Sequence, residues 1–183
     1  MHTTTAFEIE HSKDNSSNMN LDKLISSNAV ISNNDIKSKK RALELLAEQL
    51  ATEANQSASQ PLEEEIDALE IFQLLTEREK LGSTSMGHGV ALPHTRTSLT
   101  EHAIGAFLKL DEGIDFDSPD DQKTDLIFAL MVPEHYTDEH LKILAYLASL
   151  FNNANFCKEI RGTNDNKEIY KHLINWQLTS QAS

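Results

Sequence analysis

His94 is the side chain of this sequence best placed to act as a nucleophile. It directly follows Pro93, at the end of the short apolar run Val90-Ala91-Leu92, which predicts a buried strand. An arbitrary histidine is more often a surface or core residue, but ligand sites of open α/β sheets gather at such strand ends. Because proline restricts the backbone before the ring, we expect one imidazole nitrogen to donate to a backbone carbonyl. The other nitrogen would stay free, and a neutral imidazole is a good nucleophile for phosphorus.

The segment around His94 has the composition of a small anion site. Residues 80–100 contain two cations, Lys80 and Arg96, and no carboxylate, although the chain as a whole is acidic. Glycine lets a backbone approach a ligand closely, hydroxyls donate hydrogen bonds, and a guanidinium binds phosphoryl oxygens. A glycine-rich turn that happens to lack acids is the alternative. The candidate phosphoryl-binding residues are Arg78 on the preceding helix, Ser83, Thr84, Gly87 and Gly89, with Gly82 beside them.

The same glycines allow a test for a nucleotide cradle. Gly82 and Gly87 have the spacing of the two glycines of a P-loop, but His88 and Gly89 follow where that motif requires Lys and then Ser or Thr. The segment therefore predicts a site for one small anion beside a histidine, and not a nucleotide site.

His140 is a second candidate for the same chemistry. If Thr137 is the N-cap of the helix that follows, His140 occupies the third helical position. The free backbone N–H groups at that end of a helix attract phosphoryl oxygens. An ordinary solvent-facing histidine in a first turn is the open alternative.

A metal site is the competing constellation of these side chains. The spacing of the histidines is a poor match to known metal motifs, no HExxH is present, and Cys157 is the one cysteine of the chain. We therefore expect no metal and no cofactor. The side chains that such a site would draw on are His88, His94, His135, His140, Glu134 and Glu139.

Hydrophobic periodicity predicts the elements that must position these residues. Apolar runs predict strands at 29–31, 90–92, 104–110 and 126–132, the last buried on both faces. Helical spacing predicts a first helix capped by residues 33–35 and followed by a loop from Glu53 to Pro61, and a second from about Leu62 to Lys80 with Glu63, Glu64 and Glu65 in its first turn. Three further helices are expected at 137–151, 155–161 and 165–176. This order predicts a single α/β domain, a small mixed sheet sandwiched between helix layers.

Composition limits the classes of function. The chain has 183 residues and a formal net charge of -13, which argues against nucleic acid and anionic membranes as partners. No apolar run approaches the ~20 residues of a membrane helix, and no signal peptide is visible, so we expect a cytoplasmic protein without membrane insertion. Residues 1–20 are polar and predict a mobile N-terminal tail, residues 21–176 the domain, and residues 177–183 a C-terminal tail.

The run from Arg78 through Gly-Ser-Thr to Gly87-x-Gly-Val-Ala-Leu-Pro-His94 resembles the active-site segment of the type-2 enzyme IIA proteins of the bacterial phosphoenolpyruvate-dependent phosphotransferase system, the fructose and mannitol class. The likeness extends from about Leu21 to Trp176 and is strongest to the nitrogen-related branch, the enzyme IIA(Ntr) proteins. The sequence departs from the family pattern at His88, where Asn is frequent, and at Thr95, where Gly is usual.

The resemblance implies a phosphocarrier. It makes His94 the tele-phosphohistidine nucleophile, His140 a stabiliser of the phosphoryl group and Arg78 a clamp on its oxygens, with an HPr-like phosphocarrier as donor. It also implies regulatory targets such as sensor kinases or ion transporters. The absence of a fused membrane or HPr-like segment favours this regulatory role over phosphate transfer to a sugar permease, which is the alternative. A metal hydrolase built on the histidines is a more remote one.

Overall fold

Two long apolar strands form the centre of a six-stranded mixed sheet. β5 (Ile104–Ile114) and β6 (Thr124–Pro133) pair antiparallel and are almost entirely buried. β1 (Val30–Asn33) lies parallel to β5 at one edge. On the other side of β6 lie β3 (Val90–Ala91) and β4 (His94–Thr97), both parallel to it, and β2 (Ser85–Gly87) pairs antiparallel with β3. The computed structural model describes residues 19–59 and 63–176.

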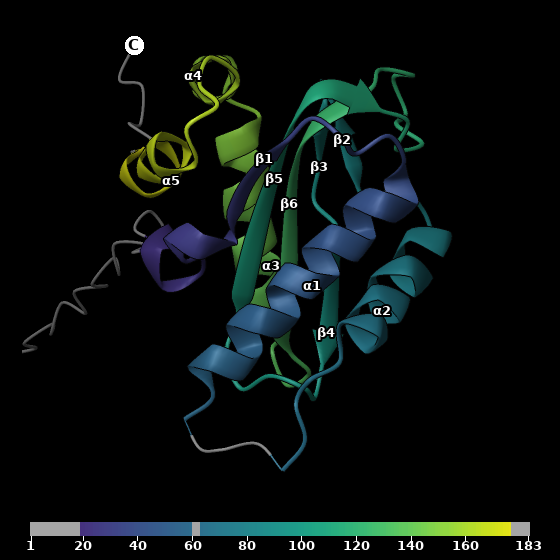
Figure 1. The fold of residues 1–183 in the computed structure, drawn as a ribbon, viewed down its shortest axis with the longest axis vertical. Coiled ribbons are helices and arrows are strands. Elements are labelled where there is room, and N and C mark those ends of the chain that lie inside the picture. Colours follow the sequence, from purple (N-terminus) through teal and green to yellow (C-terminus); the bar gives the residue numbers. More distant parts are fainter. Residues whose placement is uncertain (1–18, 60–62, 177–183) are drawn as a thin grey trace, which may run out of the picture.

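Helices cover both faces of this sheet (Figure 1). α1 (Lys39–Ser57) and α2 (Ala68–Lys80) lie on one face and α3 (Asp138–Phe151) on the other, while α4 (Ala154–Arg161) and α5 (Asn166–Asn175) lie toward the β1 edge. Two short 3-10 turns, Leu21–Lys23 and Ser27–Ala29, precede β1. The predicted α/β fold, a mixed sheet between helix layers, is confirmed.

Aromatic packing joins α3 and α4 to the sheet. The Phe151 ring of α3 stacks on Phe107 of β5 at a centroid distance of 5.7 Å, and Phe156 of α4 meets Phe151 edge-on at 5.3 Å. Phe107 and Phe156 are fully buried. Burying such rings contributes on the order of 2 kcal/mol each before the entropy of ordering the chain is counted.

Most differences from the predicted elements concern strands: two were not predicted, and two are longer than predicted. Six strands are present among the described residues instead of four, because no strand was predicted for the segments that form β2 and β4. β5 continues to Ile114 and β6 begins at Thr124, so the predicted loop between them is shorter. α4 and α5 differ from their predicted bounds by one residue at an end, which is ordinary for helix termini.

The predicted starts of the first two helices were wrong. α1 begins at Lys39 with Ser38 as N-cap and runs to Ser57. α2 begins at Ala68, because Asp67 caps it and the Asn55 side chain holds the backbone N–H and C=O of Ile66 at 2.8 and 3.2 Å. Leu62 itself lies outside the described residues. The acids Glu63, Glu64 and Glu65 therefore precede the helix instead of forming its first turn.

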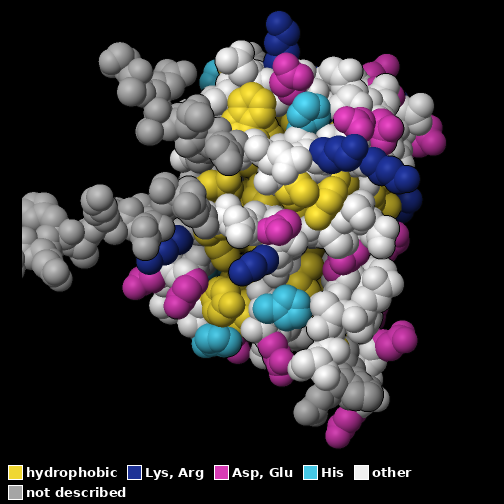
Figure 2. Space-filling model, turned by 90° about the vertical axis from the view of Figure 1, so that its left-hand side faces the viewer, with side chains coloured by type: hydrophobic (Ala, Val, Ile, Leu, Met, Phe, Trp, Pro, Cys, Tyr) yellow, Lys and Arg dark blue, Asp and Glu magenta, His cyan; other side chains and the backbone are white. Residues whose placement is uncertain are grey.

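On the face drawn in Figure 2, hydrophobic side chains form a band across the middle, with acidic, basic and histidine side chains around it. In the described ranges 19–59 and 63–176, no helix combines the length and the hydropathy that crossing a membrane requires. The predicted tails at 1–20 and 177–183 lie outside these ranges apart from residues 19 and 20.

The revised start of α2 makes a prediction. Replacing Asp67 with Ala removes the acceptor for the Leu69 N–H and lowers the free energy of unfolding by about 1 kcal/mol. Glu64→Ala, at a position once expected inside the helix, leaves it within about 0.5 kcal/mol of the unchanged protein. Urea unfolding measures both, and a greater loss for Glu64→Ala would contradict the assigned start.

Candidate active site

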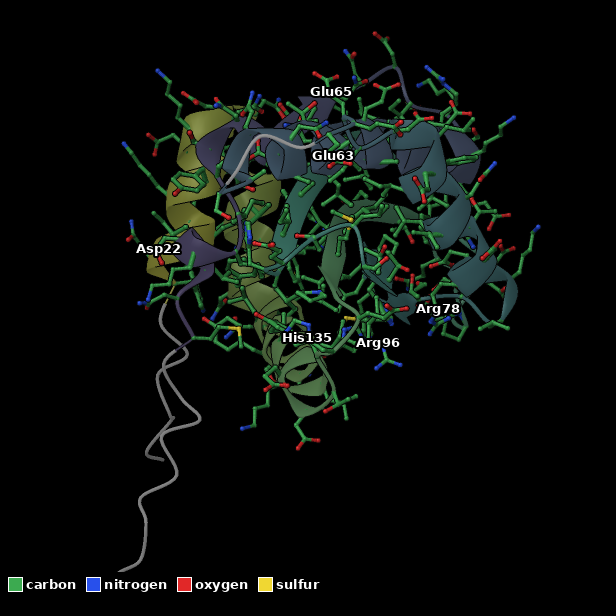
Figure 3. The ribbon with its side chains drawn as sticks, turned by 90° about the horizontal axis from the view of Figure 1, so that it is seen from below. Asp22, Glu63, Glu65, Arg78, Arg96 and His135 are labelled. Atoms are coloured by element: carbon green, nitrogen blue, oxygen red, sulfur yellow. The ribbon has the colours of Figure 1, made fainter. Side chains whose placement is uncertain are left out.

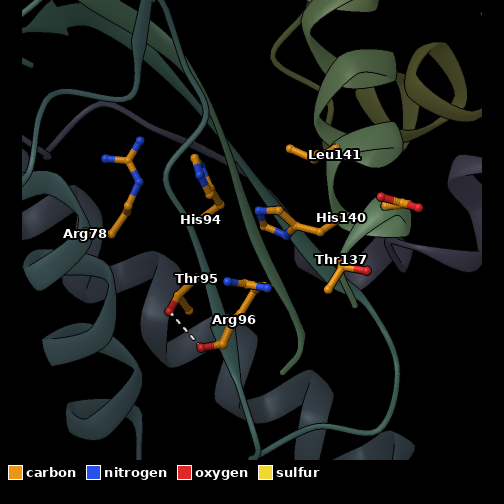
Figure 4. Close-up of a pocket in the computed structure, with 8 residues that line it drawn as sticks. Arg78, His94, Thr95, Arg96, Thr137, His140 and Leu141 are labelled. Carbon is orange, nitrogen blue, oxygen red and sulfur yellow. Dashed lines mark hydrogen bonds between the residues drawn. The ribbon is translucent and has the colours of Figure 1, made fainter. Parts of the chain in front are cut away.

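The candidate site is a pocket of about 440 Å³ between the last turn of α2, the start of β4 and the first turn of α3 (Figure 4). It brings together three residues that the sequence singled out on separate segments, Arg78, His94 and His140. The pocket is lined by Arg78, His94, Thr95, Arg96, Thr137, Asp138, His140 and Leu141.

The His94 ring is fixed by its own backbone neighbourhood. Its Nδ1 lies 2.7 Å from the carbonyl oxygen of Leu92. Because a carbonyl oxygen only accepts, Nδ1 carries the ring proton and Nε2 has the free lone pair. Pro93 separates the two residues in the break between β3 and β4, and the ladder to β6 is maintained by the Leu130 N–H, which donates to the Pro93 carbonyl at 2.9 Å.

His94 is neutral around pH 7. Its pKa lies below the ordinary 6.5, chiefly because burial disfavours the charged ring and secondarily because Arg78 is a nearby cation. The hydrogen bond to Leu92 and the charge of Glu79 oppose this shift in part. A lowered pKa keeps the nucleophilic, neutral form populated down to a lower pH.

His140 faces His94 from the first turn of α3. The two ring centroids lie 5.4 Å apart at an interplanar angle of 54°. His140 is 9% exposed, and its Nδ1 is buried without a hydrogen-bond partner in the described part of the chain. Burial, with His94 and Arg96 as neighbours, lowers its pKa, so it too is neutral. Thr137 occupies the expected N-cap position of α3, but its side chain makes no capping hydrogen bond.

Two guanidinium groups supply the positive charge of the pocket. Arg78 donates from Nη1 to the Gly82 carbonyl at 2.9 Å, and Arg96 donates from Nη1 to the Tyr136 carbonyl at 3.2 Å. Within the described residues, the remaining N–H groups of each guanidinium make no hydrogen bond. Both lie at the same end of the molecule (Figure 3). The sequence reasoning missed Arg96 as a site residue. Its position two residues after His94 would have placed it on the same side of the chain, had 94–97 been recognised as a strand.

The hydroxyls of Ser83 and Thr84 do not line this pocket. Ser83 Oγ donates to the Phe116 carbonyl at 2.7 Å, and the Thr84 hydroxyl donates to the Glu79 carboxylate. Each hydroxyl therefore has a protein partner and helps to hold the turn that follows α2, and a phosphoryl-binding role for either one stays a prediction.

The glycines of the turn make room for protein groups instead of a ligand. A Cβ on Gly87 would lie 2.9 Å from Asp120 Oδ2, and a Cβ on Gly89 would lie 2.6 Å from Arg161 Nη2 and 2.7 Å from Asp125 Oδ1. Both glycines have φ near +81°. Carboxylates from elsewhere in the chain therefore lie against the acid-free segment, and the role of Gly87 and Gly89 in phosphoryl binding stays a prediction.

The histidines and carboxylates do not converge on a metal-binding geometry within the described residues: no three or more His, Cys, Asp or Glu side chains lie together as a metal ion would require.

Comparison with known proteins agrees with this architecture. Residues 23–176 match the family described as "Phosphoenolpyruvate-dependent sugar phosphotransferase system, EIIA 2". The chain belongs to this enzyme IIA family. A nitrogen regulatory protein of Pseudomonas aeruginosa is 39% identical over 140 residues, covering 76% of this chain and 85% of that protein. One from Bradyrhizobium diazoefficiens is 37% identical over 150 residues, covering 82% and 92%.

Solved structures of enzyme IIA proteins share this fold. The crystal structure of the nitrogen regulatory protein IIA-Ntr from Neisseria meningitidis superposes with a TM-score of 0.73 at 32% identity, covering 84% of this chain and 98% of that one. The IIA mannitol structure from Escherichia coli, at 20% identity and a TM-score of 0.62, shares the fold; it covers 80% of this chain and 96% of that one. The protein is thus a homologue of the nitrogen regulatory IIA proteins and a phosphotransfer component of this system.

The structure shows the surroundings of His88 and Thr95, the two positions at which this enzyme IIA departs from the family pattern. His88 adopts φ 55°, a left-handed conformation that Asn tolerates well, and its N–H donates to Asp120 Oδ2 at 2.8 Å. The hydrogen bond from the Ser118 hydroxyl and, after it, the one from the His88 N–H lower the pKa of Asp120 to about 2. Thr95 is buried and lines the pocket.

The packing around Gly89 predicts a stability effect. Gly89→Ala forces a Cβ against Arg161 and Asp125 in a left-handed backbone and lowers the free energy of unfolding by about 2 kcal/mol. Gly162→Ala is the matched control, because its φ is -77° and its nearest contact would be 3.4 Å. It should change stability by less than about 0.5 kcal/mol. Equal stability of the two variants would contradict this account of the turn.

The charges around His94 predict its titration. An NMR titration should give a pKa below 6.5 for His94, and Arg78→Gln should raise it, because removal of a nearby cation makes protonation easier. Lys80→Gln, an exposed cation two residues further along that makes no contribution to the shift, should leave it unchanged. A lower pKa in Arg78→Gln would contradict the electrostatic account.

Proposed function

We propose that this protein is a phosphocarrier that accepts a phosphoryl group on His94 from the phosphohistidine of an HPr-like donor protein. The observation that carries the proposal is the hydrogen bond from His94 Nδ1 to Leu92, which leaves Nε2 as the nucleophilic nitrogen in a pocket with two guanidinium groups. The membership of the enzyme IIA family supports it.

The transfer needs no proton donor or acceptor. The lone pair of His94 Nε2 forms the new N–P bond while the bond between phosphorus and the donor imidazole breaks, and its electron pair stays on that imidazole. Arg78 and Arg96 draw the charged equatorial oxygens of the moving group, and a ring N–H of His140 donates to one of them. Fixed positive charge and positioning of this kind supply most of the catalysis in phosphoryl transfer.

Phosphorylation of His94 would change the surface that partners meet. A phosphoryl group carries roughly -1.5 to -2 charges at neutral pH and would offset the two guanidinium groups of the pocket. Leu141 lines the pocket with 64% of its surface exposed, so the rim is accessible to another protein. Because several relatives are nitrogen regulatory proteins, we infer a phosphorylation-dependent regulatory role toward target proteins such as sensor kinases or ion transporters. Transfer to a sugar permease is the competing outcome.

His94→Ala should abolish phosphate uptake. The variant, incubated with phosphoenolpyruvate, enzyme I and an HPr-like carrier, should take up less than about 1% of the acid-labile phosphate of the unchanged protein, since the nucleophile is gone. His102→Ala, an exposed histidine of the loop after β4, is the control and should be phosphorylated normally.

Phosphate uptake by His94→Ala at the normal rate would overturn the proposal. The competing outcome has its own test: the phosphorylated protein is mixed with membranes that hold a fructose or mannitol permease, and phosphorylation of the sugar is measured. Sugar phosphate formation would favour the transport role, and its absence supports the regulatory one.

A further inference from the structure

Glu79 is a buried carboxylate beside the site that the proposed chemistry does not use. It follows Arg78 on the last turn of α2 and is 8% exposed. Its carboxylate accepts the Thr84 N–H at 3.2 Å and the Thr84 hydroxyl, and pairs with Lys39 Nζ at 2.9 Å. Removing a carboxylate from water costs free energy, which the hydrogen bonds and the ion pair of Glu79 must offset. We therefore ask which part of the site these interactions hold in place.

A continuous chain of hydrogen bonds leads from this carboxylate to the nucleophile. Glu79 holds the Thr84 peptide, and the Thr84 carbonyl accepts the Leu92 N–H at 3.1 Å. The Leu92 carbonyl in turn accepts the ring proton of His94 at 2.7 Å. Leu92 is therefore held at its N–H by the turn after α2 and at its carbonyl by the His94 ring.

Arg78, the residue before Glu79, holds the start of the turn that contains Thr84. Arg78 donates to the Gly82 carbonyl at 2.9 Å, so consecutive residues of α2 grip the two sides of the Gly82–Thr84 turn. One of the two, Arg78, also lines the pocket. Movement of the turn would thus displace the guanidinium and the Leu92 carbonyl together.

Lys39 connects this arrangement to α1. Its ammonium, at the first position of that helix, also pairs with Asp117 at 3.2 Å and lies 4.7 Å from the centre of the Phe116 ring. Its side chain is 20% exposed. The Glu79 charge is therefore balanced in place, and the carboxylate can accept all three of its hydrogen bonds at once.

We propose that Glu79, held by Lys39, is a positioning residue that fixes the orientation and tautomer of His94 through Thr84 and Leu92. The inference rests on the proposed function of His94 and deepens it. A glutamine in place of Glu79 keeps the shape but has one acceptor oxygen, and its NH₂ group would have to face a donor. The Thr84 turn would then lose at least one bond, and the Leu92 carbonyl would be held less firmly.

The first test measures the resting ring. In Glu79→Gln, the ¹⁵N chemical shifts of His94 at pH 8 should move from a nearly pure Nδ1–H tautomer toward a mixture of the two. Single-turnover transfer from phosphorylated donor should slow in proportion to the lost Nδ1–H fraction, about twofold for an equal mixture, because fewer rings present Nε2, while the KM for the donor should stay within twofold. Glu77→Gln, exposed on the same helix, should change none of these values.

A milder pair of variants guards against loss of folding in Glu79→Gln. Thr84→Val removes one hydroxyl from the chain of bonds, and Thr84→Ser retains it. Thr84→Val should shift the His94 tautomer balance in the same direction as Glu79→Gln by a smaller amount, and Thr84→Ser should leave it as in the unchanged protein.

Lys39→Met should shift the His94 tautomer balance in the same direction as Glu79→Gln, since it removes the cation that holds the carboxylate.

The outcomes of these experiments test the positioning role of Glu79 separately from the proposed phosphocarrier function. An unchanged tautomer in folded Glu79→Gln, or in Thr84→Val if the former does not fold, would overturn the positioning role. A proportional rise in KM with no loss of turnover would overturn it as well. Because the tautomer is measured without any phosphate, failure of His94 to accept phosphate in the unchanged protein would remove the proposed function and leave the structural result standing.

Discussion

The hydrogen bond between His94 Nδ1 and the Leu92 carbonyl is the constraint on which the site depends. It decides which nitrogen can attack, and it exists because the chain breaks its strand at Pro93. β3 ends at Ala91, and the pairing with β6 resumes at His94, so the residues between them lie outside both strands. The proline carbonyl still accepts from Leu130, which keeps the break anchored to the central strand. The break between β3 and β4 is thereby held by hydrogen bonds at both Leu92 and Pro93.

Local charge, and not overall charge, makes the pocket suitable for an anion. The chain carries a formal net charge of -13, yet the pocket gathers two guanidinium groups and two neutral imidazoles. The acidic groups nearest to the glycine-rich turn are engaged: Asp120 accepts from the His88 N–H, and Asp125 is paired with Arg161. Asp138 is the one carboxylate among the described residues that line the pocket, against the guanidinium groups of Arg78 and Arg96.

Much of this could be predicted from the sequence, and the misses have physical causes. His94, Arg78 and His140 were each singled out by residue type and position, and their joint role rested on the resemblance to the enzyme IIA family, while β5 and β6 were visible as long apolar runs. Arg96 was missed because a four-residue polar strand leaves no apolar pattern. The side chains that lie against Gly87 and Gly89 could not be predicted, since a glycine indicates a close approach to the backbone without identifying the group that approaches. The start of α2 was wrong because a tertiary contact, Asn55 to Ile66, overrides the local pattern.

The most direct measurement for the central claim identifies the ring nitrogen that carries the phosphoryl group. The protein, labelled with ¹⁵N at its histidines and phosphorylated by its donor, would be examined by NMR for coupling between phosphorus and nitrogen. The hydrogen bond to Leu92 predicts coupling to Nε2 of His94, with Nδ1 still protonated. A phosphoryl group on Nδ1 of His94, or on any other residue, would contradict the account.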